Sequence, residues 1–342
     1  MRIRKPLFVF LYLIFLILLL EVWARAYYAM ERGVPFFSSA ADQVYMWYPE
    51  LKKMDGYEYD EDKVNILLLG GSALTEEWGK VPPYLSEEAG SVLGKEANIV
   101  NLAAPAHSSL DSLYKYRWVG GERFDLVVFY HGINEVRANN VPAELWKNDY
   151  SHYSWYDEVN FFFRHDWLRG QPFVLPYFVK HLLVQLDREV IHRGRHVPTH
   201  SPKQEWLECG KEIKTKASFG NNIRRIAETA RRRKEPLMVM TFAYFYPEGD
   251  EYDEESPYVS FTRIWGLPEN VMLGIREHNE VIRRIAPDAE FILLDQQELM
   301  GGKKRNFEDI CHFSDEGSRV FAGNVVGKYR DIYLLRKEEE EK

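Results

Sequence analysis

Five short apolar runs recur along the chain, separated by longer segments in which apolar and polar residues follow helical spacing. The runs are Val64–Gly70, Asn98–Ala103, Asp125–His131, Pro236–Ala243 and Ala289–Asp295. Their apolarity is continuous rather than alternating, which is typical of strands covered on both faces in a parallel sheet. The helical segments are Pro82–Lys95, Ser109–Val119, Asn221–Lys234, Glu269–Ile285 and Asp315–Leu335. This alternation predicts a doubly wound α/β domain around a parallel five-stranded sheet.

The N-terminus has a different pattern, an uninterrupted apolar run over Pro6–Leu20 behind a basic tip. Such a run suits a signal peptide or a membrane span. Cleavage requires small residues, which Ala24 and Ala26 supply, but Arg25 lies between them. We therefore expect an uncleaved transmembrane signal-anchor over residues 1–30.

Basic residues predict the orientation of this anchor. Arg2, Arg4 and Lys5 precede the apolar run, and positive charge marks the cytoplasmic side of a span. The N-terminus is then cytoplasmic, and the remainder of the chain is extracytoplasmic. Trp23, Tyr27 and Tyr28 are expected to form an aromatic belt at the far interface.

The rest of the chain divides by composition. We expect a membrane-proximal linker at 31–62, a catalytic domain at 63–336 and a charged tail at 337–342. A long segment at about 138–219 interrupts the domain and is rich in aromatic residues. Three interpretations of it stay open: stacking on sugar rings, contact with the bilayer, or a subsidiary core of its own. A second aromatic loop, Tyr244–Trp265, is expected at the active-site edge.

Charge and cysteine content exclude several classes. The 44 Lys and Arg against 52 Asp and Glu give a net charge of −8, which argues against a nucleic-acid binder. Two cysteines, Cys209 and Cys311, cannot form a disulfide scaffold, although a single bond between them is left open. No Cys/His spacing predicts a zinc site, and we expect no metal or organic cofactor.

Several histidines do not belong to a motif. They are His181, His192, His196 and His200 in the insertion, and His107 and His131 near the strand ends. The first group lies among Arg188, Arg193 and Arg195, which would repel a cation, so we interpret it as a solvated basic face. The second pair is expected to be structural.

Polar signatures follow two predicted strands, and another precedes the last predicted helix. Ser72 follows Gly70 and Gly71 at the end of the first strand, and Asn134 follows Gly132 after the third. Asp309 lies three residues before His312, close enough to hold its imidazole. Taken singly, these are explained by a helix cap, an Asn turn and a local capping pair. Their common position at one edge of the sheet instead favours a catalytic constellation.

These motifs, in this order along the chain, resemble the sequence motifs of the SGNH hydrolases, also called GDSL esterases and lipases. Three of the four sequence blocks of that family are recognisable, over about Val64 to Leu335 less the insertion. The resemblance implies a three-layer α/β/α sandwich with a flavodoxin-like parallel sheet, which agrees with the number of predicted strands. It also implies that Ser72 is the nucleophile, that His312 is the general base and then acid, and that Asp309 orients it. Gly70, Gly71 and Gly132 would support the turns.

The resemblance also assigns the oxyanion hole, and here the sequence departs from the family. The donors would be the backbone N–H groups of Ser72 and Ala106 and the side-chain amide of Asn134. Gly71 replaces the acidic residue of the family's Gly-Asp-Ser turn, and Ala106 replaces the glycine that follows strand two. Glu135 replaces the aspartate that ends the family's Gly-x-Asn-Asp turn after strand three. Alanine supplies the same N–H provided that its φ is negative.

These features predict a membrane-anchored extracytoplasmic serine esterase that acts on an acyl ester. Relatives with this layout commonly act on acylated envelope polysaccharides, so we expect removal of a short acyl group, acetyl first, from a carbohydrate. Three alternatives remain: an O-acyltransferase with the same acyl-enzyme, a catalytically silent glycan-binding or assembly protein, and a lipase whose insertion is a lid. No protein partner is indicated.

Overall fold

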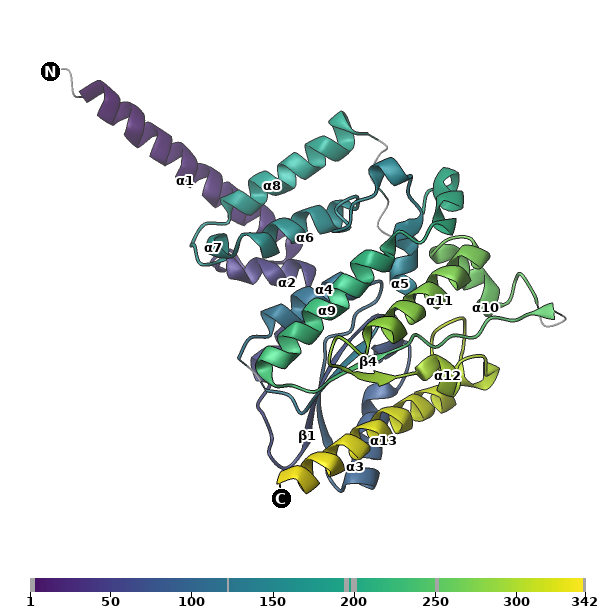
Figure 1. Ribbon diagram of the computed structural model, residues 1–342. Coiled ribbons are helices and arrows are strands. Elements are labelled where there is room, and N and C mark those ends of the chain that lie inside the picture. Colours follow the sequence, from purple (N-terminus) through teal and green to yellow (C-terminus); the bar gives the residue numbers. More distant parts are fainter. Residues whose placement is uncertain (1–3, 122, 194–196, 198–201, 250–251, 341–342) are drawn as a thin grey trace. The chain divides into compact units, whose positions relative to one another are not determined.

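The computed structural model describes residues 4–121, 123–193, 197, 202–249 and 252–340 (Figure 1). These residues form two compact units: the N-terminal unit, from residues 1–49 and 149–199, and the sheet unit, from residues 50–148 and 200–342. The segment 149–199, which lies inside the expected insertion, thus groups with the N-terminal part of the chain. Arg2, Arg195, His196 and His200 lie outside the described residues.

The described part of the sheet unit contains one parallel sheet in the order β2-β1-β3-β4-β5. Its strands are β1 (Val64–Gly70), β2 (Ala97–Asn101), β3 (Leu126–Tyr130), β4 (Leu237–Met240) and β5 (Ile292–Leu294). The five-stranded parallel sheet is therefore as predicted, and the order is that of flavodoxin-like folds. β1 matches its predicted bounds, whereas the other strands are shorter than their apolar runs.

Helices cover both faces of this sheet, which completes the three layers (Figure 1). The longer ones are α3 (Val81–Leu93), α4 (Ser109–Trp118), α9 (Thr215–Arg233), α11 (Pro268–Ile285) and α13 (Asp315–Glu340). α3 packs with α13 on one face, and α4, α9 and α11 pack together on the other. All seven residues of β1 are consequently buried, which explains its continuous apolarity.

Short helical segments connect these elements. The short α-helices are α5 (Ile133–Val136), α10 (Pro257–Ser260) and α12 (Gln296–Met300). The 3₁₀ turns are η2 (Pro49–Gly56), η3 (Ser72–Leu74), η4 (Arg137–Asn139), η5 (Ala143–Leu145), η7 (Gln204–Lys211), η9 (Phe261–Ile264) and η10 (Lys304–Asn306).

Strand order determines where a ligand site can form. β1 lies between β2 and β3, so the chain leaves β1 in one direction and returns on its other side. In open α/β sheets, ligands bind beyond the carboxyl ends of the strands at such a reversal. Gly70 and Tyr130 are partners at the ends of β1 and β3, and the sequence motifs of Ser72 and Asn134 follow them directly.

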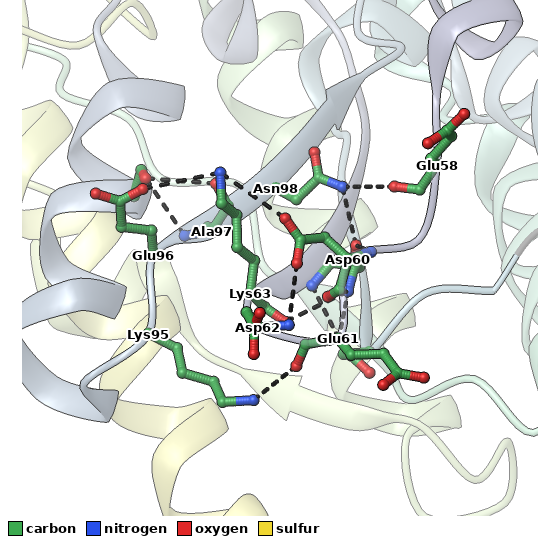
Figure 2. Close-up of polar contacts among 12 residues, drawn as sticks. Glu58, Asp60, Glu61, Asp62, Lys63, Lys95, Glu96, Ala97 and Asn98 are labelled. Carbon is green, nitrogen blue, oxygen red and sulfur yellow. Dashed lines mark hydrogen bonds and ion pairs between the residues drawn. The ribbon is translucent and has the colours of Figure 1, made fainter.

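At the amino ends of the strands, polar contacts join the segment before β1 to the start of β2 (Figure 2). Lys63 lies 4.0 Å from Asp60 and 3.9 Å from Glu96. Asn98 donates from Nδ2 to the carbonyl of Glu58 at 3.0 Å. These contacts fix the amino ends of β1 and β2.

The N-terminal unit is helical in its described residues. It contains α1 (Arg4–Arg32), η1 (Ala41–Gln43), α2 (Val44–Trp47), α6 (Ser154–Arg164), α7 (Asp166–Arg169), α8 (Leu175–Leu186) and a π-helical turn (Asp187–Ile191). The stretch Lys5–Arg32 within α1 is long and apolar enough to cross a membrane. Glu21, which ends the apolar run, does not end the helix.

Most aromatic side chains of residues 149–199 form a core for this unit. Those buried are Tyr150, Tyr153, Tyr156, Phe162, Phe163, Tyr177 and Phe178, whereas Trp167 and Phe173 are exposed. Tyr28 is also buried, so its expected place in an interfacial belt was wrong. His181 is buried between Tyr27 and Glu158 rather than solvated, which corrects the basic-face interpretation for that residue.

Candidate active site

Ser72 directly follows the Gly70-Gly71 turn at the end of β1. It opens the three-residue turn η3, and the next long helix, α3, begins only at Val81. A Cβ atom at Gly70 would lie 2.7 Å from Leu74 Cδ1 and 3.1 Å from the carbonyl oxygen of Tyr130, so a larger residue there would require the Leu74 side chain to shift. The Ser72 hydroxyl is largely buried and bonds to an imidazole, which distinguishes it from an ordinary helix cap.

His312 links this serine to a carboxylate. Its Nε2 lies 2.8 Å from Ser72 Oγ, and its Nδ1 lies 2.6 Å from Asp309 Oδ2. The arrangement assigns the proton to Nδ1, so that Nε2 accepts from the hydroxyl. Ser72, His312 and Asp309 thus form a continuous hydrogen-bonded chain across 240 residues of sequence.

Asp309 is held in its ionised form. Its other oxygen, Oδ1, accepts from the backbone N–H groups of Cys311 at 2.8 Å and His312 at 2.9 Å. Burial alone would raise the pKa of Asp309, but the hydrogen bond from His312 and these backbone donors hold that pKa below its usual range. A carboxylate in this state can both orient an imidazole and stabilise its protonated form.

Two neighbours of His312 complete its surroundings. The indole of Trp78 stacks on the imidazole, with ring centroids 4.4 Å apart and an interplanar angle of 24°. Cys311 is fully buried, and burial raises the pKa of its thiol well above the ordinary value. Cys311 therefore acts as a small apolar residue, and neither it nor Cys209 forms a disulfide. Sequence reasoning did not identify Trp78, which lies in a loop with no motif.

Asn134 reaches the site from α5, just beyond β3. Its Nδ2 donates to the carbonyl of His107 at 2.8 Å. A Cβ atom at Gly71 would lie only 2.6 Å from the same nitrogen. Glycine at position 71 therefore lets the Asn134 amide lie against the backbone beside Ser72.

Trp265 fixes the orientation of this amide. Its Nε1–H donates to Asn134 Oδ1 at 3.0 Å, and both side chains are buried. An amide whose oxygen is held in this way must turn its NH₂ group toward Gly71 and His107. The sequence placed the loop that ends at Trp265 near the site but gave no sign of this contact.

Gly132 supports the same turn. A Cβ atom there would lie 2.5 Å from Cβ of Phe242, the second residue after β4. No side chain fits between the ends of β3 and β4 at this point.

Ala106 departs from the conformation that the sequence analysis required. Its φ is +62°, in the left-handed region that favours glycine, so the condition of a negative φ is not met. The loop nevertheless keeps the conformation that a glycine would adopt. Its carbonyl accepts from Arg137 at 3.4 Å, and the next carbonyl, that of His107, accepts from Asn134.

A buried lysine lies beneath this loop. Lys115, from α4, donates to the carbonyl of Leu102 and lies 2.9 Å from both Glu50 Oε1 and His107 Nδ1. Burial lowers the pKa of Lys115, and the Glu50 carboxylate opposes that change. These contacts hold both ends of the Ala106 loop. Glu50 lies far from Lys115 in the sequence, so no local motif predicts that these two residues pair.

The remaining polar groups of this region are structural. Glu135 is buried and accepts from the backbone N–H of Ser109 at the start of α4, and burial raises its pKa to about 7. Burial lowers the pKa of His107 to about 4 and that of His131 to about 3. His131 also bonds to Ser112 at 2.7 Å. Both histidines are therefore neutral, with His131 buried and His107 half-buried, and both make structural contacts, as expected.

Comparison with known proteins finds similarity among solved structures only. No family model matches the chain, and no curated protein matches it. A GDSL-like lipase from Bacteroides thetaiotaomicron is 14% identical, with a TM-score of 0.47 over 86% of this chain and 100% of that one. A lipase/acylhydrolase from Enterococcus faecalis is 16% identical, with a TM-score of 0.42 over 78% and 96%. An acetylxylan esterase from Geobacillus stearothermophilus is 12% identical, with a TM-score of 0.41 over 78% and 94%.

Proposed function

We propose that the protein is a membrane-anchored, extracytoplasmic serine esterase of the SGNH type, which removes a short acyl group, acetyl first, from a cell-envelope carbohydrate. The observation that carries this proposal is the chain from Ser72 Oγ through His312 to Asp309, with distances of 2.8 and 2.6 Å. A serine hydroxyl is a weak nucleophile by itself and is activated by an adjacent, oriented imidazole. The geometry supplies that activation.

The reaction begins with attack of Ser72 Oγ on the acyl carbon of the ester. A new C–O bond forms, the hydroxyl proton moves to His312 Nε2, and the carbonyl oxygen becomes an oxyanion. His312 then gives the proton to the departing sugar oxygen as the ester bond breaks. Water attacks the acyl-serine in the same way, with His312 as base, and releases the carboxylic acid.

Asn134 is positioned to stabilise the oxyanion. One Nδ2 hydrogen is used by the carbonyl of His107, which leaves the second for the substrate. The backbone N–H groups of Ser72 and Ala106 are the other proposed donors. Loss of one such donor typically costs about 10²–10³ in rate.

The membrane location rests on α1. Its 29 residues reach about 40 Å at the α-helical rise, more than the thickness of a hydrocarbon core. The basic N-terminal tip supports a cytoplasmic N-terminus. The carbohydrate substrate rests on the resemblance to the SGNH family.

One observation favours a second candidate, a catalytically silent carbohydrate-binding protein. Ala106 occupies a left-handed conformation at φ +62°, where the family has glycine. The resulting strain costs about 1–2 kcal/mol and can displace the adjacent N–H from an oxyanion. A silent protein would not need the serine-histidine-aspartate chain, which is intact.

The test uses the full chain in detergent with p-nitrophenyl esters from acetate to dodecanoate, and with acetylated xylo-oligosaccharides. We expect turnover that is highest for acetate, release of acetate from the oligosaccharide, and loss of both in Ser72→Ala. The matched control is Ser91→Ala, the same change at an exposed position of α3. Folded protein without turnover would favour the silent candidate, and a preference for long chains would favour a lipase.

A further inference from the structure

Helix α8 presents an apolar face outward. The exposed residues of this stripe are Val179 (45%), Leu182 (47%), Leu183 (56%) and Leu186 (47%), and it continues to Val190 (68%) in the π-helical turn. The opposite side of the helix, with Tyr177, Phe178 and Val184, is buried. A helix on the surface of a water-soluble protein carries polar residues outward. α8 is apolar on both sides, a pattern of helices that do not face water.

The outward face of α8 continues into an apolar groove of about 560 Å³ beside α1. The groove is lined by Ile17, Phe161, Phe173, Leu175, Val179 and Leu183, among others. Ile17 belongs to the apolar run of α1, whose side chains are mostly exposed from Leu7 to Leu20. The exposed surfaces of α1 and α8 therefore form one apolar surface.

A buried carboxylate fixes the start of α8 to α1. Glu21 accepts from the backbone N–H of Leu175 at 2.8 Å and from that of Val174 at 3.0 Å, and its partner on α1 is Arg25 at 2.7 Å. These are N–H groups that a helix start leaves without an intrahelical partner. Glu21 is the first residue after the uninterrupted apolar run, so α8 begins at the level where α1 changes from apolar to polar.

A second set of contacts fixes the orientation of α8. Tyr27 of α1 bonds through its hydroxyl to His181 Nε2, and His181 Nδ1 bonds to Glu158 of α6, both at 2.9 Å. Phe178 packs edge-on against Trp23 and Tyr27 of α1. α8 thus turns its His181 side toward α1 and α6, whereas Leu183 lies on its exposed face.

We propose that α8 and the π-helical turn lie in the interfacial layer of the same bilayer that α1 spans, with lipid acyl chains against the Val179–Val190 stripe and in the groove. The occupant is a membrane lipid because the stripe is continuous with the membrane-spanning surface and is fixed at its polar boundary. Trp167 and Phe173, two exposed aromatic residues of the segment 149–199, suit the same layer. The inference rests on the membrane anchoring in the proposed function and assigns the aromatic segment a second membrane contact.

Site-directed spin labelling of the full chain in phosphatidylcholine vesicles tests this. In a Cys209→Ser background, single cysteines replace residues 179–190 in turn, and the fully buried Cys311 stays unlabelled. Collision of each label with oxygen, which concentrates in lipid, is compared with collision with a water-soluble nickel chelate. The control label at Arg188 lies on the same segment outside the stripe, and a label at Ile14 reports on α1.

We expect the ratio of the label's collision rate with oxygen to its collision rate with the nickel chelate to vary along residues 179–190 with the period of a helix. The ratio should be several-fold higher at Val179, Leu183, Leu186 and Val190 than at Arg188. Labels along the stripe that meet the nickel chelate, while Ile14 does not, would overturn the proposal and leave the anchor intact. Labels that collide with neither reagent, and whose spectra are broadened by a nearby label, would show that a second copy of the chain covers the stripe. That result would also overturn the proposal. A water-exposed Ile14 would overturn both the anchor and the contact.

Discussion

The indole N–H of Trp265 donates to the side-chain oxygen of Asn134 at 3.0 Å, and this contact decides which end of the amide faces Ser72. Trp265 does not touch the reacting atoms in the proposed mechanism and is a positioning residue. Its hydrogen bond leaves Asn134 Nδ2 between Gly71 and the carbonyl of His107.

We predict that Trp265→Phe lowers kcat about tenfold and leaves KM nearly unchanged. Phenylalanine keeps most of the buried ring but lacks the N–H. The hydrogen bond that orients the amide, worth about 1 kcal/mol, is therefore lost. Because the oxyanion exists only in the transition state, the loss should appear in kcat. Steady-state kinetics on p-nitrophenyl acetate measures this, with Trp206→Phe as the control. An equal rise in KM would indicate a merely structural role.

A side chain at position 71 should displace the same amide. We predict that Gly71→Ala lowers kcat by about 10²–10³, the typical cost of one oxyanion donor. The added Cβ would lie 2.6 Å from Asn134 Nδ2, closer than a contact allows. Gly90→Ala is the control, since nothing lies within 4 Å of a Cβ there. Full activity in Gly71→Ala would show that Asn134 is not the donor.

The sheet and the order of the site residues could be predicted because both depend on local sequence. Val64–Gly70 is apolar throughout and followed by two glycines and Ser72, so strand, turn and serine are all read within nine residues. Asp309 and His312 lie three residues apart and meet within one turn. Contacts between distant segments gave no such signal. Trp265 reaches Asn134 across 131 residues, and Lys115 reaches Glu50 across 65.

The backbone conformation of Ala106 could not be predicted from the sequence either. An alanine at position 106 predicts a negative φ, whereas the loop holds it at +62°. The hydrogen bonds of Lys115 to Leu102 and His107 fix the loop on both sides of Ala106 and so override its local preference.

This strain gives a prediction for Ala106→Gly. Glycine adopts positive φ without steric cost, so we expect the free energy of unfolding to rise by about 1 kcal/mol. Activity should stay equal or increase. Thermal unfolding in detergent measures the effect, and Ala104→Gly, two residues earlier, should instead destabilise. A lower unfolding temperature for Ala106→Gly would show that the left-handed conformation is wrong.

The buried Glu135 should make stability depend on pH. Burial raises its pKa from 4.5 to about 7, so between these values the folded protein holds a proton that the unfolded chain has released. The free energy of unfolding then falls as pH rises from 4.5 to about 7, by an amount on the order of 3 kcal/mol. Glu135→Gln lacks this contribution. Denaturant unfolding of both proteins across this range should give curves that diverge, and parallel curves would contradict the raised pKa.

The central claim is that His312 and Asp309 activate Ser72, and a fluorophosphonate tests it without knowledge of the substrate. Such a reagent phosphonylates an activated serine oxygen and loses fluoride, which intact-mass measurement detects as one adduct per chain. We predict a single adduct on the peptide that contains Ser72, much slower labelling in His312→Gln, and none in Ser72→Ala. A folded wild-type protein that gains no adduct, or an adduct that persists in Ser72→Ala, would contradict the account.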